Sequence, residues 1–255
     1  MPQLSKSLLT LPPIIALVYG TSGSGKTSLI GEAAKHEELR PIYIADFDLR
    51  IQSLRATLSI EEMSHIYSDY YQDDKFQGTA WMDFEKIGND PKQVDLKYKL
   101  EFKTFVMDSL TFAMRAQMAR IQFLNGGKPP STAPTLPEYG SQTSGMLELL
   151  TKLRSCGKNI IVTAHEAGSK DDVTGKMFKT LDVTPSMLKT PGLFNEFWHT
   201  EILTLAGKEP EFVVRTRGDM IYSARTSFKT LDTLEKQSLV WPKIIAQIKA
   251  EKEAK

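Results

Sequence analysis

The sequence predicts an α/β fold, in which helices flank a mostly parallel β-sheet and β-segments and a terminal helix follow at the C-terminal end. Three observations carry this prediction. The apolar run Ile14 to Tyr19 leads into a glycine-rich loop and a helix, and two later apolar runs, Lys103 to Met107 and Asn159 to Ala164, end in polar residues. Helical segments separate these runs, and strands that alternate with helices form parallel sheets covered on both faces.

The first of these strands leads into residues 20–28, which match the phosphate-loop pattern G-x-x-x-x-G-K-[ST]. The helix that follows, Thr27 to His36, supplies the context that the motif requires. Inward-facing backbone N–H groups and the positive end of the helix dipole make such a loop an anion site. Lys26 would reach the β- and γ-phosphates, and the Thr27 hydroxyl would bind Mg²⁺. The residues expected to bind nucleotide are Gly20, Thr21, Ser22, Gly23, Ser24, Gly25, Lys26, Thr27 and Ser28.

A second short apolar run, Pro41 to Ala45, ends in Asp46-Phe47-Asp48. Ligands of open α/β sheets bind beyond the carboxyl ends of the strands, so these carboxylates would lie at the same edge as the phosphate loop. Only one of them needs to face the loop. The alternative is that an aspartate here caps the helix that follows.

The run Lys103 to Met107 ends in Asp108-Ser109 and has the pattern of a Walker B strand. Its aspartate would hold the water shell of Mg²⁺ beside Thr27, and we expect the strand to lie next to the phosphate-loop strand. A helix with a core-facing stripe follows over Leu110 to Leu124.

The run Asn159 to Ala164 reads as the next buried strand and ends in His165-Glu166. A polar side chain just beyond a central strand can contact the γ-phosphate, and His165 stands there. The alternative is that His165 is only a loop residue.

The segments between these strands are polar. Residues 54–100 predict a polar aromatic loop followed by two short helices, and 125–139 a long mobile loop rich in glycine and proline. A helix is expected over 140–154, followed by a second long polar stretch over 166–191.

The C-terminal part predicts three β-segments, over 200–205, 211–217 and 220–224. A basic helix over 241–255 follows, with Pro242 in its first turn.

The composition is that of an ordinary globular protein. The chain has 255 residues, of which 41% are hydrophobic and 25% charged. Its net charge of +1 means that any nucleic-acid surface has to be a local patch. The lone Cys156 forms no internal disulfide, no apolar run approaches membrane-span length, and the proline-broken N-terminus is unlike a signal peptide. We therefore expect a cytoplasmic protein without a membrane partner.

The single domain expected over 1–255 has three parts. They are an N-terminal tail over 1–12, a nucleotide-binding core over 13–206, and a C-terminal β-hairpin and helix over 207–255.

Together, the phosphate loop, the acid-tipped second strand, Phe-Val-Met-Asp108-Ser109 and Ile-Ile-Val-Thr-Ala-His165-Glu166 resemble the RecA-type ATPase core. The resemblance covers roughly residues 12–246 and is greatest to short phage-encoded RecA-like proteins that anneal single-stranded DNA. An Asp-Glu pair at 108–109 would have pointed to AAA+ motors instead. By position, Asp48 matches the water-activating acid of the family, with Asp46 as its neighbour or substitute. His165 stands where RecA-type proteins usually carry an amide, as it does in the phage group.

The same resemblance implies partners. Residues 125–139 and 166–191 occupy the places of the two loops that hold single-stranded DNA in RecA-type proteins. Arg225 is the nearest match to the basic residue that touches the nucleotide of a neighbouring subunit, which implies a homo-oligomeric ring or filament. The side chains that could contact DNA are Lys128, Tyr139, Lys170, Lys176 and Lys179.

The residues predict ATP hydrolysis with Mg²⁺, and the resemblance implies that this activity is coupled to single-stranded DNA binding and to annealing in homologous recombination. No guanine-reading Asn-Lys-x-Asp sequence occurs, which favours ATP. A phage or host single-strand binding protein is an expected partner, and the host cytoplasm the expected location. The main alternative is a P-loop ATPase that regulates a replication or packaging partner without direct DNA binding. A small-molecule kinase and a nucleotide-dependent scaffold are further alternatives.

Overall fold

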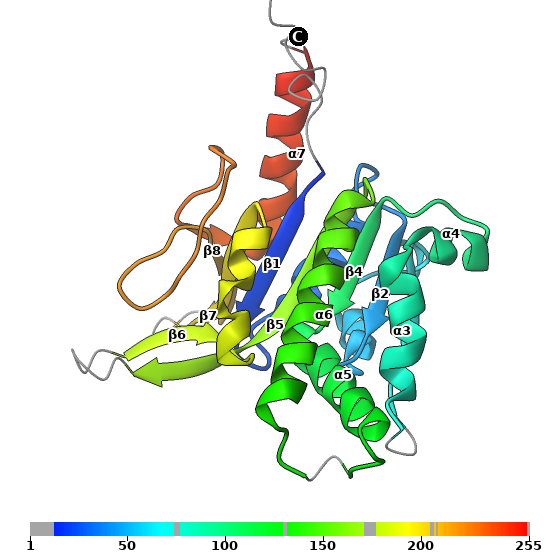
Figure 1. The fold of residues 1–255 in the computed structure, drawn as a ribbon. Coiled ribbons are helices and arrows are strands. Elements are labelled where there is room, and N and C mark those ends of the chain that lie inside the picture. Colours follow the sequence, from blue (N-terminus) through cyan, green and yellow to red (C-terminus); the bar gives the residue numbers. More distant parts are fainter. Residues whose placement is uncertain are drawn as a thin grey trace, which may run out of the picture.

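The computed structural model describes residues 13–73, 77–129, 132–170, 177–204, 207 and 209–253. A central sheet with the strand order β3-β2-β4-β5-β1-β7-β8-β9 runs through this part of the chain (Figure 1). The strands from β3 to β7 in this order are parallel, β8 and β9 are antiparallel additions, and β6 forms a hairpin with β5. The strands are β1 Ile15–Gly20, β2 Ile42–Asp46, β3 Ile66–Tyr70, β4 Thr104–Asp108, β5 Asn159–Lys170, β6 Met177–Leu181, β7 Glu196–Leu203, β8 Glu211–Arg215 and β9 Leu234–Lys236.

Helices cover both faces of the sheet, as the alternating residues of β1 show. Ile15, Leu17 and Tyr19 pack in one hydrophobic cluster with α3, α5 and α6, whereas Ala16 and Val18 pack in a second cluster with α1 and α7 (Figure 1). Burial on both faces explains why the strand is apolar at every position. The helices are α1 Lys26–Ala34, η2 Ile51–Ala56, α2 Ile60–Met63, α3 Thr79–Asn89, α4 Lys92–Tyr98, α5 Leu110–Leu124, α6 Leu136–Ser155, η3 Pro185–Leu193 and α7 Gln237–Glu253.

The predicted fold class is confirmed: the sheet is mostly parallel, helices flank it, and β-segments and a helix follow at the C-terminal end. The prediction that the Walker B strand lies next to the phosphate-loop strand is wrong. β4 pairs with β2 and β5, and β5 lies between β4 and β1. The first half of β5, residues 160–164, is buried, with β4 on one edge and β1 on the other. Among the described helices, none combines the length and the apolar character needed to cross a membrane.

Two further expectations fail in the first half of the chain. The predicted polar aromatic loop contains a strand, β3, which pairs with β2 at the edge of the sheet and is only half-buried. Because β3 contains polar residues, it lacks the apolar pattern by which a strand is predicted. The predicted loop over 125–139 ends earlier than expected, because α6 begins at Leu136. Glu138 accepts the backbone N–H of Thr135 at 2.7 Å and caps this helix, and Pro137 lies in the first turn, where proline is tolerated.

The predicted polar stretch over 166–191 is largely regular. β5 continues to Lys170 and pairs with β6, so these residues form a projecting hairpin (Figure 1). The segment 220–224, all of it described, forms no strand. Asp219 Oδ1 accepts the N–H groups of Ile221 and Tyr222 and closes a tight turn there instead. The strand that completes the sheet is β9.

The final helix begins four residues earlier than predicted, at Gln237. Pro242 therefore lies inside α7 rather than in its first turn. Val240 and Trp241 are fully buried against the sheet and α1, and this packing holds the early turns of the helix.

Candidate functional site

The phosphate loop connects β1 to α1 and depends on two glycines. A Cβ atom at Gly20 would lie 2.5 Å from the Ser24 hydroxyl and from the Thr200 carbonyl oxygen. Gly25 precedes α1 with φ of 93°, a left-handed conformation that glycine adopts readily. Ser24 Oγ also lies 2.7 Å from Thr200 Oγ1 on β7, so a neighbouring strand braces the loop. The backbone is thus held in a fixed curve at a helix N-terminus, which is a geometry that binds anions.

Lys26 is buried under this loop. Its Nζ donates to the carbonyl oxygens of Gly20 at 2.9 Å and Thr21 at 2.8 Å. Burial lowers the pKa of Lys26, and the nearby carboxylates of Asp108 and Asp48 oppose that effect. Because its present partners are neutral carbonyls, a phosphate would supply the negative charge that this cation lacks.

Thr27 and Asp108 lie side by side, although β1 and β4 are not neighbouring strands. Thr27 Oγ1 donates to Asp108 Oδ2 at 3.0 Å, and Thr163 on β5 donates to the other carboxylate oxygen. Burial raises the pKa of Asp108, while these two hydrogen bonds oppose the shift. A hydroxyl next to a carboxylate is a hard oxygen donor set, so the residues fit Mg²⁺.

The two carboxylates at the end of β2 have different places. Asp46 is fully buried, and its carboxylate accepts the N–H groups of Leu49 at 2.7 Å and Ile51 at 3.3 Å. Burial and the neighbouring Asp108 raise the pKa of Asp46 to about 6. Asp48 instead places its Oδ2 3.1 Å from His165 Nε2, on the side of the phosphate loop. Asp46 therefore caps the turn, and Asp48 faces the site.

Lys26, Thr27, Asp48 and His165 line one cavity of about 180 Å³ together with the phosphate loop. His165 is held there by its backbone N–H, which donates to Thr111 Oγ1 at 3.0 Å. Arg50, which was not predicted from the sequence, also lines this cavity. Arg50 belongs to no known motif. Its position two residues after Asp48 is the one sequence feature that could have indicated a place near the site.

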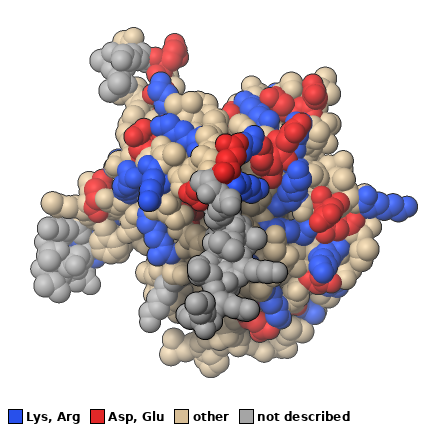
Figure 2. Space-filling model, turned by 90° about the horizontal axis from the view of Figure 1, so that it is seen from above, with Lys and Arg blue, Asp and Glu red and all other residues tan. Residues whose placement is uncertain are grey.

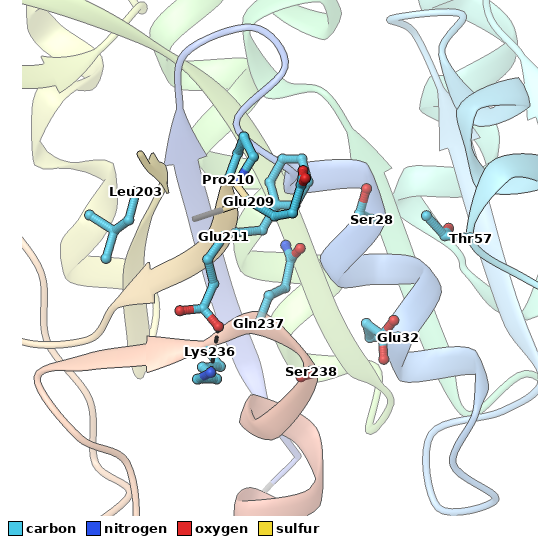
Figure 3. Close-up of a pocket in the computed structure, with 11 residues that line it drawn as sticks. Ser28, Glu32, Thr57, Leu203, Glu209, Pro210, Glu211, Lys236, Gln237 and Ser238 are labelled. Carbon is cyan, nitrogen blue, oxygen red and sulfur yellow. Dashed lines mark ion pairs between the residues drawn. The ribbon is translucent and has the colours of Figure 1, made fainter. Parts of the chain in front are cut away.

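A second pocket of about 530 Å³ adjoins the first and shares Ser28 and Phe212 with it. Figure 3 shows its walls, which come from α1, β8 and the start of α7. Gln237 Nε2 donates to the carbonyl oxygen of Gly25 at 2.5 Å, so α7 reaches the phosphate loop directly. Glu211 on the same wall is paired with Lys236 at 2.6 Å. The sequence could not place these residues, because β8 and α7 lie far along the chain from the loop.

Arg225 lies away from this cavity. Its Nη2 donates to the carbonyl oxygens of Pro191 and Phe194, and its backbone pairs with Phe197 on β7. The guanidinium thus binds its own chain, and its role toward a neighbouring subunit stays a prediction.

Two of the side chains expected to contact DNA, Lys128 on the α5–α6 connection and Lys179 on β6, already form ion pairs. Lys128 pairs with Glu138 at 2.9 Å, and Lys179 pairs with Glu166 at 2.7 Å. Lys170 ends β5, Tyr139 lies partly exposed on α6, and Lys176 lies outside the described residues.

Glu166 is the buried centre of one of these pairs. It also contacts His199 Nε2 at 2.6 Å. Burial alone would raise the pKa of Glu166, but the hydrogen bonds from Lys179 and His199 outweigh burial and lower it. The hairpin is therefore joined to β7 through this carboxylate.

Comparison with known proteins identifies a family. A family model described as an AAA domain matches residues 13–198, which include the phosphate loop, Asp48, Asp108 and His165. No curated protein sequence matches the chain. Among solved structures, the RadB recombinase is 18% identical, with a TM-score of 0.43, and the match covers 81% of this chain and 82% of that one. A KaiC-like protein from the hyperthermophilic archaeon Pyrococcus horikoshii OT3 is 14% identical, with a TM-score of 0.46 and 83% and 82% coverage.

Proposed function

The chain belongs to the AAA domain family, and from this premise we propose that it is a RecA-like P-loop ATPase that hydrolyses ATP to ADP and phosphate. The observation that carries the proposal is the grouping of Lys26, Thr27, Asp48 and His165 around one cavity, with Asp108 bonded to Thr27. Phosphoryl transfer needs positioning and charge neutralisation more than covalent chemistry, and these groups supply both.

Each residue has a distinct part in the proposed reaction. Lys26 turns its Nζ from the loop carbonyls to the β- and γ-phosphate oxygens. Thr27 and Asp108 would hold Mg²⁺, which neutralises charge on the phosphates. Asp48 orients the attacking water and accepts its proton, and His165 fixes the Asp48 carboxylate through their 3.1 Å contact.

The nucleoside would occupy the adjoining pocket of about 530 Å³. Its size exceeds what a base and ribose need, and the ring of Phe212 offers an apolar surface beside Gly25. The amide of Gln237 is buried at the junction of the two cavities and offers its oxygen to a base amino group. We propose ATP as the nucleotide, because no guanine-reading motif occurs.

We further propose that ATP controls binding to single-stranded DNA, and that the protein anneals strands as a homo-oligomer in the cytoplasm of a host cell, alongside a phage or host single-strand binding protein. Support comes from the placement of the α5–α6 connection and the β5–β6 hairpin, which both project from the phosphate-loop end of the sheet (Figure 1). On the opposite end, around the C-terminus of α7, the basic and acidic side chains of the described residues are interspersed (Figure 2).

One observation favours a second function, in which the ATPase regulates a replication or packaging partner without binding DNA. Lys128 and Lys179 already pair with Glu138 and Glu166, and a phosphate would have to compete with these carboxylates.

The deciding experiment is an ATPase assay of the purified protein with Mg²⁺, into which an unlabelled single-stranded oligonucleotide is titrated. We expect measurable hydrolysis and its stimulation by the oligonucleotide. Hydrolysis that ignores the oligonucleotide would favour the partner-regulating function, and no hydrolysis or nucleotide binding under any condition would contradict both.

A further inference from the structure

Arg50 stands at the mouth of the phosphate-loop cavity. It precedes η2, in the turn that the buried carboxylate of Asp46 closes by accepting the N–H groups of Leu49 and Ile51. Two part-buried hydrogen bonds to Asp46 therefore hold the backbone on either side of Arg50, while the Arg50 side chain is 53% exposed. This combination anchors a long cationic side chain at one end and leaves the guanidinium free to move.

The guanidinium of Arg50 contacts both the phosphate loop and Asp48. Its Nη1 donates to Ser22 Oγ on the phosphate loop at 2.5 Å, and its Nε lies 3.5 Å from Asp48 Oδ1. Ser22 is neutral, and Asp48 shares its carboxylate with His165. A phosphate oxygen would be a stronger partner than either, because a guanidinium binds phosphate in a bidentate, charge-assisted way.

The positive charge of Arg50 affects Lys26 inside the cavity. Arg50 acts together with burial to lower the pKa of Lys26, so the two cations repel each other across the same space. A triphosphate would lie between them and relieve this repulsion. Among the described residues that line the cavity, Arg50 and Lys26 are the two with permanent positive charge.

We propose that Arg50 is a catalytic residue that acts within its own subunit, by placing its guanidinium on the γ-phosphate as ATP is cleaved. In this step the water oxygen forms a bond to the γ-phosphorus, and the bond from that phosphorus to the β–γ bridging oxygen breaks. Its electron pair leaves with ADP, and the water proton passes to Asp48. Arg50 neutralises the charge that develops on the transferred group, and its departure from Asp48 frees that carboxylate for the water. The inference rests on the proposed ATPase function.

Arg225 is a poorer candidate for this role in the single chain. Its guanidinium donates to two backbone carbonyls of its own chain, those of Pro191 and Phe194. Moving it would leave those carbonyls without these donors, whereas Arg50 would give up only a surface hydroxyl and a shared carboxylate.

The first test compares steady-state ATP hydrolysis by Arg50→Ala, Arg50→Lys and a control, Arg217→Ala, which removes an exposed arginine outside the site. We expect Arg50→Ala to lower kcat by at least about 100-fold while KM changes less than about 3-fold, because the contact is stronger in the transition state than with bound ATP. Arg50→Lys should recover part of the loss, and Arg217→Ala should match the parent. Thermal melting checks folding, and Arg50→Gln, which keeps a side chain of similar length, repeats the test if the alanine variant is unstable.

The second test is independent of turnover. Calorimetry measures the affinity for MgADP alone and for MgADP with aluminium fluoride, which mimics the transferred phosphoryl group. The parent should bind MgADP at least about 10-fold more tightly with aluminium fluoride, and Arg50→Ala should lose this gain while its MgADP affinity is unchanged. A parent that gains nothing from aluminium fluoride, or a variant that keeps the full gain, would overturn the role of Arg50.

Mixing two inactive variants tests whether Arg50 acts within its own subunit. Arg50→Ala retains Lys26, and Lys26→Ala retains Arg50, so activity that returns on mixing would show that the arginine acts on a neighbouring subunit and would overturn the assignment. Absence of recovery supports it. The proposed function fails separately: a parent that neither hydrolyses ATP nor binds MgADP overturns both, whereas an active parent with fully active Arg50 variants overturns the Arg50 inference alone.

Discussion

The nucleotide site and the projecting β5–β6 hairpin differ in how their polar side chains are held. At the nucleotide site, Thr27 and Thr163 each donate a hydrogen bond to Asp108, and the three side chains are buried or half-buried. On the hairpin, Lys179 is half-buried and pairs with the buried carboxylate of Glu166, so only the lysine end of this pair reaches solvent. Buried polar networks fix a geometry in advance, which phosphoryl transfer requires, whereas a lysine that reaches solvent exchanges partners more easily than a fully buried group. We infer that the first region suits catalysis and that the second suits reversible contacts.

The largest effect should follow from Lys26→Ala, which removes the cation under the phosphate loop. We expect ATP turnover to fall by more than about 1,000-fold, the scale on which one phosphate-stabilising cation acts, together with weaker nucleotide binding. Melting should stay close to that of the parent, because the buried charge is not itself a source of stability. Lys35→Ala, at the exposed end of the same helix, is the matched control. Parental turnover in Lys26→Ala would mean that the loop does not bind the triphosphate.

The next largest effect should distinguish Asp46 and Asp48, the two aspartates at the end of β2. Asp48→Asn should bind ATP with Mg²⁺ but lose about 100- to 10,000-fold in turnover, the range for a residue that takes a proton in the transition state. Asp46→Asn should lose less, since its carboxylate bonds the turn rather than the cavity. Affinity from calorimetry and turnover from phosphate release are measured for both variants. Equal and mild losses would assign both residues to capping.

A smaller effect, on single-stranded DNA binding, is expected from lysine replacements in the hairpin and the α5–α6 connection. Replacing Lys128, Lys176 and Lys179 with alanine should weaken single-stranded DNA binding for every sequence and flatten the slope of log affinity against log salt by roughly 0.7 per lost contact. ATP binding should be unchanged. Fluorescence anisotropy with a labelled oligonucleotide at several salt concentrations measures the slope, with and without a non-hydrolysable ATP analogue.

The control for this experiment is a triple variant with alanine at Lys92, Lys249 and Lys252, which carries the same charge change away from the hairpin. Its salt slope should equal that of the parent. If the parent binds no single strand in any nucleotide state, the annealing function is wrong and the partner-regulating ATPase replaces it.

The smallest effect should be a pH dependence of folding stability. The pKa of Asp46 is raised to about 6, so between the unfolded pKa near 4 and this value the folded chain binds more protons than the unfolded chain. Its contribution to the free energy of unfolding therefore falls as pH rises through this window. Asp46→Asn should lose less stability than the parent between pH 4 and pH 7 in urea unfolding. A parallel pH dependence in both proteins would contradict the shift.

Sequence patterns predicted the elements whose signals are local. The phosphate loop is a contiguous motif, and Asp48, Asp108 and His165 were found because each follows an apolar strand whose carboxyl end must lie at one edge of the sheet. The structure brings Asp48 and His165 to the same cavity as the loop and bonds Asp108 to Thr27. The roles of these residues stay predictions until the variants are measured.

The features that were missed depend on contacts between distant parts of the chain. β3 is stabilised by pairing with β2, not by an apolar pattern of its own. Gln237 reaches Gly25 only because α7 packs on α1, and no pattern in either segment indicates that contact. The prolines before α6 suggested a loop, yet one of them lies in the first helical turn, where its missing N–H has no partner to lose.

The two hydrogen bonds that α7 makes to Gly25 and Leu29 can form only after nearly the whole chain has been synthesised. Gln237 and Trp241 donate to the carbonyl oxygens of Gly25 and Leu29, and each bond spans 212 positions of sequence. A growing chain leaves the ribosome with its phosphate loop long before these donors exist, and domains complete their folding only when such distant contacts close. A nascent chain stopped before α7 carries the whole motif without its brace. We therefore expect a chain stopped before α7 to hold nucleotide less firmly than a chain that includes this helix.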